Sequence, residues 1–292
     1  MKRLPNSPNL LPNLLVALAT GALLAACAGN AKPKLPYPAF QQADELPDMF
    51  IAALPGVRAK PLAGDLKTRI ASNRVDFPEA WSGTTGGSPG KATEIFVLAG
   101  EIALSGFTLG PGGYAYVPPG SLGFQLEVDQ GARVLFFNDD VDDRAMIRSP
   151  IILESQVLEW VPVANGIEEK VLRQDPGTGA RTWLLRISPD ARQPWTASSA
   201  VREGYMLSGQ YQHSECFNGE ALTWPYAPGG YFQRPSGTYN GGPESVATTR
   251  TIWLLREHTA GEVTTMPECV YIPPAAADET GDDEDQNQSL FD

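Results

Sequence analysis

The chain has 292 residues, enough for about two domains of roughly 150 residues each. Its 22 Lys and Arg residues and 34 Asp and Glu residues give a formal net charge of −12 at pH 7, and no long basic run offsets this acidity, which argues against nucleic acid as a partner. With 29 glycines, 26 prolines and an ordinary hydrophobic fraction of 42%, the composition favours a folded, turn-rich and mostly β protein.

The first 27 residues have the pattern of an export signal. The apolar run Leu14–Leu24 follows two basic residues; it is too short to span a bilayer core, which needs about 20 residues, and is typical of a signal peptide. The run ends in LAAC, which resembles the processing site of bacterial lipoproteins, where the cysteine is linked to diacylglycerol and the chain is cut before it. Residues 1–26 are therefore predicted to be a lipoprotein signal peptide and Cys27 the lipidated residue; the alternatives are an ordinary secretory signal or an uncleaved anchor.

The lipoprotein resemblance implies a location at the cell envelope. Two or three acyl chains hold a protein stably on a membrane surface, so the membrane is an expected partner, bound through Cys27 and not spanned. In a Gram-negative cell, Ala28 after the cysteine is similar to the class of lipoproteins destined for the outer membrane. In such a cell we expect a periplasmic protein anchored to the outer membrane.

Two segments of low apolar content flank the body of the chain. Residues 27–45 are rich in Pro and Ala and are predicted to be a lipid-anchored tether. Residues 275–292 carry six acidic residues between positions 278 and 285 and are predicted to be a disordered acidic tail. Between these segments we predict two domains, residues 46–160 and residues 161–274.

Short apolar or alternating runs bounded by Gly and Pro fill these two domains, and they predict β-strands and no helix of three or more turns. One pattern occurs twice: a Glu, five residues and a Gly, then PGGY, then three residues and P-x-G. The first copy begins at Glu94 and the second at Glu203. The offset between the copies is 109 residues at the Glu and 117 at the PGGY block, so the second copy carries an insertion between them.

This repeat resembles the cupin superfamily, and specifically the bicupins, which contain two tandem small β-barrels. The residue types suit such a fold, because Pro presets φ at the start of a turn, Gly permits positive φ, and alternating strands direct every second side chain into a barrel lumen. The resemblance covers roughly residues 65–140 and 175–258. It implies an all-β fold of two tandem cupin-like, jelly-roll β-barrels, and by analogy a homodimer.

Metal-binding cupins surround the ion with three histidines and one glutamate. The resemblance places the glutamates at Glu94 and Glu203, but no histidine precedes either one, and the third histidine position holds Asn240 in the second copy and a glycine in the first. The chain has two histidines in all, and His213 and His258 are interpreted as a loop residue and a strand-exit residue. No metal site, no cofactor and no catalytic residue is therefore predicted.

The second copy offers polar and aromatic side chains at candidate lumen positions. Period-2 alternation puts Glu203 and Tyr205 on one face of their strand, and Tyr231 and Gln233 on one face of theirs. Aromatic walls with a few polar groups are typical of small-ligand pockets, although the same residues could fill a barrel core. The predicted ligand-binding residues are Trp195, Glu203, Tyr205, Tyr231, Gln233 and Asn240.

Two cysteines, Cys216 and Cys269, remain when Cys27 is lipidated, an even number in the oxidising compartment that an export signal implies. A disulfide between them would close a loop of 53 residues and contribute about 3 to 4 kcal/mol to stability. Two separate buried thiols are the alternative, because the sequence does not give the Cα separation that a disulfide requires.

Taken together, the patterns favour a non-catalytic, lipid-anchored bicupin that binds a small polar ligand or a protein partner at the cell envelope without a metal ion. The alternative is a metal-dependent cupin enzyme of the dioxygenase or isomerase type, with an atypical ligand set around Glu203 that recruits His213. A purely structural envelope protein is compatible with the same patterns.

Overall fold

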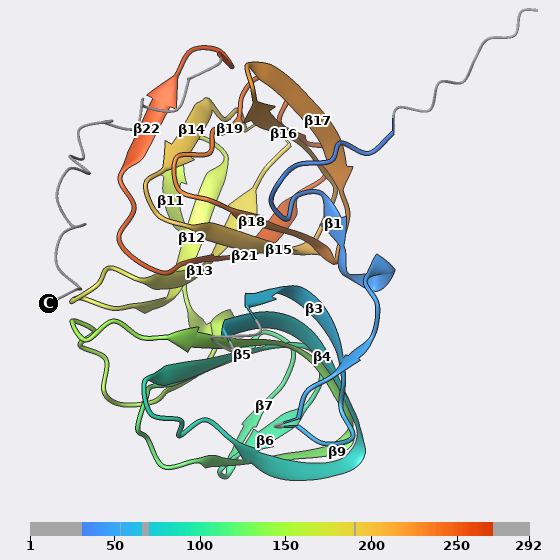
Figure 1. The fold of residues 1–292 in the computed structure, drawn as a ribbon, viewed down its shortest axis with the longest axis vertical. Helices are drawn as coiled ribbons and strands as arrows, with labels where there is room; N and C mark the ends of the chain where they lie inside the picture. The colour runs from blue at the N-terminus through green and yellow to red at the C-terminus, as the bar shows by residue number, and fades with distance from the viewer. Residues whose placement is uncertain (1–30, 53, 66–69, 190, 271–292) are drawn as a thin grey trace, which may run out of the picture. The chain divides into compact units, whose positions relative to one another are not determined.

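The computed structural model describes residues 31–52, 54–65, 70–189 and 191–270. The predicted signal peptide, the predicted lipidation site Cys27 and the predicted acidic tail lie outside these residues. Within them the chain forms twenty-two strands, β1–β22, and two three-residue 3-10 helices, η1 and η2, so the predicted all-β fold is confirmed (Figure 1). No helix in this described part is long and apolar enough to cross a bilayer.

The first half of the chain forms one antiparallel sheet of nine strands that curls around a hydrophobic core. Its strand order is β10-β8-β5-β9-β4-β3-β2, with β6 paired to β9 and β7 paired to β6. The long strands β4 and β9 pair in one constant register along most of their length, and Ala80 within β4 has a φ of 52°. The strands are β2 (Met49–Phe50), β3 (Arg58–Asp65), β4 (Ile70–Thr85), β5 (Lys91–Gly100), β6 (Ile102–Leu104), β7 (Phe107–Leu109), β8 (Gly113–Val117), β9 (Phe124–Asp140) and β10 (Ile151–Glu154).

The second half of the chain packs two sheets face to face. A seven-stranded sheet has the order β1-β18-β15-β21-β13-β12-β11, and a six-stranded sheet has the order β17-β16-β19-β14-β22 with β20 paired to β16. Figure 1 shows this half above the first one. The strands are β1 (Gln41–Gln42), β11 (Val161–Ala164), β12 (Ile167–Gln174), β13 (Arg181–Ile187), β14 (Trp195–Ser198), β15 (Arg202–Ser208), β16 (Tyr211–Phe217), β17 (Glu220–Tyr226), β18 (Gly230–Arg234), β19 (Asn240–Gly241), β20 (Val246–Ala247), β21 (Thr251–Glu257) and β22 (Val263–Met266).

Side-chain alternation divides the buried apolar residues among three cores. Ile95 of β5 packs in the lumen of the first half, and Met206 and Phe232 pack in the lumen of the second half, between its two sheets. The intervening side chains of the same strands, such as Phe96 and Tyr205, form a third core between the two halves. Each of these strands is therefore buried on both faces, which explains its nearly continuous apolar sequence.

The sequence repeat corresponds to a structural repeat. Strands β5 and β8 pair with Glu94 opposite Tyr116, and β15 and β18 pair in the same register with Glu203 opposite Gln233. Both PGGY turns hold their first glycine at a φ of 90°, a conformation that side chains with a Cβ rarely adopt. The repeated glycines and prolines therefore mark the same turns in both halves.

A short arm precedes each copy of the repeat in the chain and pairs with the other copy. Strand β1, followed by η1 (Ala43–Glu45), pairs with β18 of the second half, whereas β10, followed by η2 (Ser155–Val157), pairs with β8 of the first half. The two arms make equivalent hydrogen bonds, because Ala43 donates its N–H to Gly229 at 2.9 Å and Ser155 donates its N–H to Gly112 at 3.1 Å. This reciprocal exchange of arms joins the two halves by main-chain pairing.

The exchanged arm corrects the predicted tether, which was expected to run through residue 45. Phe40 is 2% exposed in the core of the second half, and its N–H donates to the Tyr226 hydroxyl at 2.8 Å. Although the segment is Pro-rich, Phe40 supplies the apolar side chain and β18 the open edge that fold it onto the second half. The change from first-half to second-half strands lies between β10 and β11, the stretch that contains the predicted domain boundary at residues 160 and 161.

Candidate functional site

Glu94 and Glu203, the two glutamates of the repeat, lie at the interface between the halves and not in the barrel lumens. Each is 1% exposed, on β5 and β15 respectively. Their chain neighbours Ile95 and Gly204 face the lumens, where a Cβ at Gly204 would touch Phe232. The prediction that Glu203 lines a lumen is therefore wrong, because alternation along β15 directs Gly204 inward and Glu203 toward the first half.

Hydroxyl groups from both halves donate to the two glutamates in a matching arrangement. Each glutamate accepts a bond from the tyrosine of its own PGGY turn: Tyr114 to Glu94 at 2.8 Å and Tyr231 to Glu203 at 2.6 Å. Each also accepts a bond from a hydroxyl of the opposite half: Thr182 to Glu94 at 3.0 Å and Ser72 to Glu203 at 2.7 Å. The predicted ligand residues Glu203 and Tyr231 are thus bonded to each other and to the first half.

Two guanidinium groups, both from the second half, neutralise these glutamates. Arg256 of β21 donates through Nε to Glu94 at 2.6 Å and through its two other nitrogens to Glu203 and Asp139. Arg173 of β12 donates through Nε to Glu94 at 2.5 Å. The Arg256 guanidinium also lies over the ring of Phe137, 4.0 Å from its centroid; Phe137 holds the equivalent place in the first half, opposite Glu94.

The guanidiniums keep the glutamates ionised despite their burial. Burial by itself raises the pKa of Glu94, but the charges of Arg173 and Arg256 outweigh it and hold the pKa at about 2. For Glu203 the same balance, with Arg256 as the main favourable charge, holds the pKa well below its ordinary value. Both carboxylates therefore carry a full negative charge across the physiological range.

His258, interpreted from the sequence as a strand-exit residue, lies directly after β21 and joins this network. Its Nε2 is 3.5 Å from Glu203 and its Nδ1 is 3.7 Å from Asp139. Burial by itself lowers the pKa of His258. The hydrogen bond to Glu203 and the charge of Asp139 raise this pKa by more than burial lowers it, so the net shift is upward. Protonated His258 balances the network, because the two arginines alone face three carboxylates.

The lumen of the second half holds a second buried ion pair. Arg234 of β18 donates to Glu215 of β16 at 2.7 Å, and another of its nitrogens lies 2.8 Å from Nε2 of His213. Burial and the Arg234 charge lower the pKa of His213 well below its ordinary value, so the ring is neutral and accepts at Nε2. The interpretation of His213 as a loop residue is wrong: it is 4% exposed on β16, because the insertion folds into a hairpin of the six-stranded sheet.

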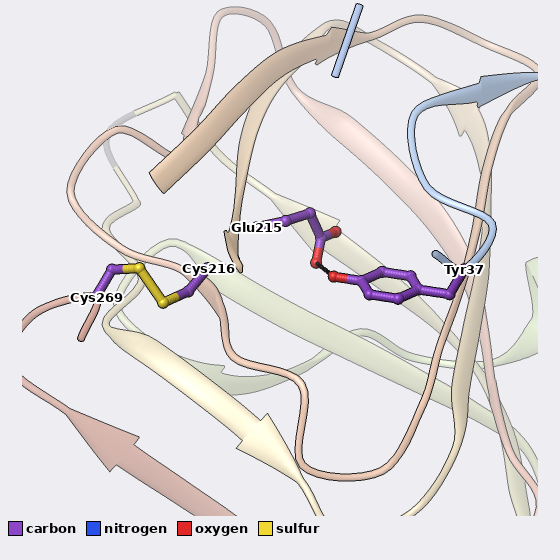
Figure 2. The surroundings of a disulfide bond; sticks show 4 residues. All are labelled: Tyr37, Glu215, Cys216 and Cys269. Carbon is purple, nitrogen blue, oxygen red and sulfur yellow. Dashed lines mark hydrogen bonds between the residues drawn. A yellow bond between two sulfur atoms is a disulfide. The ribbon is translucent and has the colours of Figure 1, made fainter. Parts of the chain in front are cut away.

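The arm preceding β1 and a disulfide flank this lumen cluster. The Tyr37 hydroxyl donates to Glu215 at 3.4 Å, and Figure 2 shows Tyr37 approaching Glu215 from the arm. Cys216, next to Glu215, forms a disulfide with Cys269, with a Cα–Cα distance of 5.5 Å. The sequence left the alternative of two separate thiols open, and the structure has the bridge.

The remaining predicted ligand residues do not converge on one site. Trp195 of β14 is buried and its ring covers Gly242, where a Cβ would lie 2.2 Å from a ring atom. Asn240 of β19 donates to the Thr196 carbonyl at 3.1 Å, on the six-stranded sheet. Gln233 alternates with Phe232 on β18, which places it on the interface side with Tyr231. The six predicted residues are therefore divided between two sheets.

A family-type metal site does not fit these donors. Glu94 and Glu203 point away from the lumens and bind guanidinium groups, and in the second lumen the Nε2 of His213 faces Arg234. Within the described residues, no three His, Cys, Asp or Glu side chains are grouped so that they could hold a metal ion. The alternative ligand set of Glu203 and His213 is also not assembled, since Glu203 faces the first half and His213 the second lumen.

Sequence reasoning missed the cations of the interface network, Arg173 and Arg256, and placed Arg234 only near the candidate lumen residues. Arg256 lies within the run TIWLLRE, which is otherwise typical of a buried strand, and Arg234 directly precedes the P-x-G turn of the second copy. Aligning the two copies of the repeat could have identified Arg256. The equivalent residue of the first copy is the apolar Phe137, so Arg256 introduces a charge on a strand face that is otherwise apolar. A buried cation predicts a buried carboxylate partner.

Comparison with known proteins supports this architecture. Residues 148–253 match the family model of the ChrR cupin-like domain. Similar solved structures include the protein Ylba from E. coli, with 18% identity and a TM-score of 0.60 over 77% of this chain and 93% of that chain. The chain has a cupin fold. No curated protein matches it.

Two further similar structures carry the names of enzymes. A protein described as a putative dioxygenase from Nostoc punctiforme has 20% identity and a TM-score of 0.61 over 84% of this chain and 90% of that chain. Oxalate decarboxylase from Bacillus subtilis has 10% identity and a TM-score of 0.55 over 80% of this chain and 81% of that chain. Identities this low show a shared fold alone.

Replacement of Arg256 tests whether the network holds the halves together. Arg256→Met removes the cation that three interface carboxylates share and leaves only Arg173 and His258 to balance them, so we expect it to lower the free energy of unfolding by about 3–5 kcal/mol. The control is Arg144→Met, which removes an exposed pair with Asp142 and should leave the urea midpoint nearly unchanged, because solvent screens such a pair. Equal urea midpoints for the two variants would show that the network contributes little.

His258 gives the network a pH dependence that can be measured against His258→Gln. The stabilisation from the protonated ring is complete below about pH 6.5, the pKa of His in the unfolded chain, and is lost as the pH rises through the higher pKa of the folded protein. In urea unfolding, wild type should exceed the variant by up to about 1 kcal/mol at low pH and lose this advantage at higher pH. His213 is present in both proteins, so its opposite effect on stability cancels in the comparison. A difference in the free energy of unfolding that stays the same across the pH range would contradict the role of His258.

Proposed function

We propose that this chain is a non-catalytic, lipid-anchored cupin-fold protein of the cell envelope that binds a small polar ligand or a protein partner without a metal ion. The observation that carries the proposal is the binding of both repeat glutamates by Arg256. A carboxylate that already accepts bonds from a guanidinium and from hydroxyl groups has little capacity left for a transition metal. The residues that the family resemblance offers as metal ligands thus serve here to join the two halves.

The lumens give the same indication. In the first half the lumen is filled by apolar side chains, among them Ile95, Val134 and Phe136. In the second half it is filled by aromatic side chains around the Arg234–Glu215 pair, whose remaining groups are bonded to His213 and Tyr37. Because packed side chains fill both lumens, the lumens serve as the cores of the two halves. We therefore expect a ligand-binding site on the surfaces between the two halves.

A metal-dependent enzyme of the dioxygenase or isomerase type is the second candidate. Its support is the structural likeness to proteins described as a putative dioxygenase and as oxalate decarboxylase. It would need a ligand set other than Glu203 with His213, because these two side chains face different cores. Without such a set, the binding function is the better supported of the two.

Metal analysis of the purified full chain separates the two candidates. We expect less than about 0.1 equivalents of iron, manganese, nickel, copper or zinc per chain after extraction in mild detergent, because the candidate ligands are bound to arginines. Glu203→Gln serves as the matched variant and should leave the metal content unchanged. A stoichiometric metal that Glu203→Gln removes would establish the enzyme candidate and overturn the proposal.

The proposed anchor is tested by Cys27→Ala. Thioether-linked acyl chains account for stable attachment to a membrane, so wild type should sediment with the membrane fraction and the variant should not be processed to the acylated form. Mass spectrometry of the mature N-terminal peptide should show a diacylglyceryl addition on Cys27. An unmodified cysteine, with the chain cut elsewhere, would support an ordinary secretory signal.

A further inference from the structure

A groove with a volume of about 550 Å³ opens between the two halves beside Tyr205. Strands β4, β5 and β9 of the first half line one wall, and β12, β13, β15 and β21 of the second half line the other. The groove lies along the same interface as the ion network, since β5 and β15 run from Glu94 and Glu203 in the network to Leu98 and Leu207 in the groove. It belongs to neither barrel lumen.

The two walls come from equivalent strands but differ in charge. Arg74 of β4 and Arg133 of β9 hold the places that Leu184 of β13 and Ile252 of β21 hold in the other half, as the matching strand registers show. All four residues line the groove. At these two equivalent positions the first half therefore presents arginines to the groove and the second half presents apolar side chains, although the fold is duplicated.

Arg74 provides a buried donor that lacks a partner. The residue is 3% exposed, and its Nε–H makes no hydrogen bond. Its Nη1 donates to Asp44 at 2.6 Å, and the Tyr205 hydroxyl interacts with the guanidinium. Because a buried N–H without an acceptor costs free energy, an anion that reaches Nε would be stabilised there.

The other charged groups of the groove leave an excess of positive charge. Arg133 donates to Asp76 at 2.5 Å, and Lys170 donates to the Ser155 carbonyl at 2.9 Å with its Nζ 4.9 Å from the Trp160 ring centroid. Three cations, Arg74, Arg133 and Lys170, thus face two carboxylates, those of Asp44 and Asp76. This basic groove occurs in a chain whose net charge is −12, so it favours an anion locally against the field of the whole protein.

Apolar side chains occupy the rest of the groove. Phe96, Leu98, Leu184 and Leu207 lie along it, and the Trp160 ring borders the Lys170 side. Pockets that combine an apolar wall with a few placed polar groups are typical of small-ligand sites. A ligand that fits both walls has a negatively charged end and an apolar body.

We propose that this groove binds a small carboxylic acid with an apolar body, its carboxylate lying beside the guanidinium groups of Arg74 and Arg133 and the ammonium group of Lys170. The apolar body lies against the leucines of the second-half wall. This inference rests on the proposed binding function and names its ligand class.

The test compares two probes with the same apolar body, of which only one carries a carboxylate. Isothermal titration of the detergent-extracted full chain with 4-phenylbutyrate should show saturable binding, and 4-phenylbutan-1-ol, which has the same body without the carboxylate, should bind about tenfold more weakly or not at all. Partition into detergent contributes equally for every variant of the protein, so differences between variants report on the groove.

Three variants locate the site. Arg133→Gln changes a half-exposed side chain and should weaken 4-phenylbutyrate binding by about fivefold, whereas Arg74→Gln should weaken it by about tenfold or more. Arg148→Gln changes an exposed arginine that does not line the groove and should leave the affinity unchanged. Circular dichroism and the unfolding midpoint establish that each variant is folded, and Arg133→Gln keeps the test valid where Arg74→Gln does not fold.

Equal affinity for the acid and the alcohol, or unchanged binding in Arg133→Gln, would overturn the inference. Absence of binding at about 10 mM for both 4-phenylbutyrate and octanoate would overturn it as well. In either case the metal analysis of the same preparation still decides the proposed function, because metal content does not depend on the groove. A bound metal would defeat the proposed function whatever the groove binds.

Discussion

The guanidinium of Arg256 is the point on which the arrangement of the two halves depends. It is 2% exposed and donates to carboxylates of both halves, Glu94 and Asp139 from the first and Glu203 from the second. A cation buried so fully needs carboxylate partners, and the carboxylates in turn need this cation together with Arg173 and His258. The halves are therefore matched in charge as well as in shape, and their separation would leave several buried charges unpaired.

Duplication explains why such a network can form. Two copies of one strand pattern place their glutamates, their PGGY tyrosines and a hydroxyl residue in equivalent positions, so each half supplies one hydroxyl group to the glutamate of the other. The exchanged arms follow the same logic, because β1 and β10 each cover an edge strand of the opposite half. An edge covered in this way is not open to pairing with another chain.

The two halves differ at positions where one carries a charged residue and the other an apolar one. These differences account for the ion network and for the basic groove. Arg256 stands where the first half has Phe137, and Arg74 stands where the second half has Leu184. The first substitution gives the interface its cation, and the second gives the groove its basic wall. A duplicated fold with an apolar interface would need neither, so both cations carry a role that packing alone does not explain.

The sequence by itself determined the all-β class, the two copies and the positions of their turns, because Gly, Pro and alternation act locally through φ and through the two-residue period of a strand. It also placed Glu203, Tyr205 and Tyr231 on a common side of their sheet. Only the tertiary structure decided that this side faces the other half. Both faces of these strands are buried, so the sequence has no exposed polar face that would distinguish the lumen side from the interface side. The contact of His258 with Asp139 and that of Phe40 with Tyr226 likewise join residues more than a hundred positions apart, to which local sequence pattern is blind.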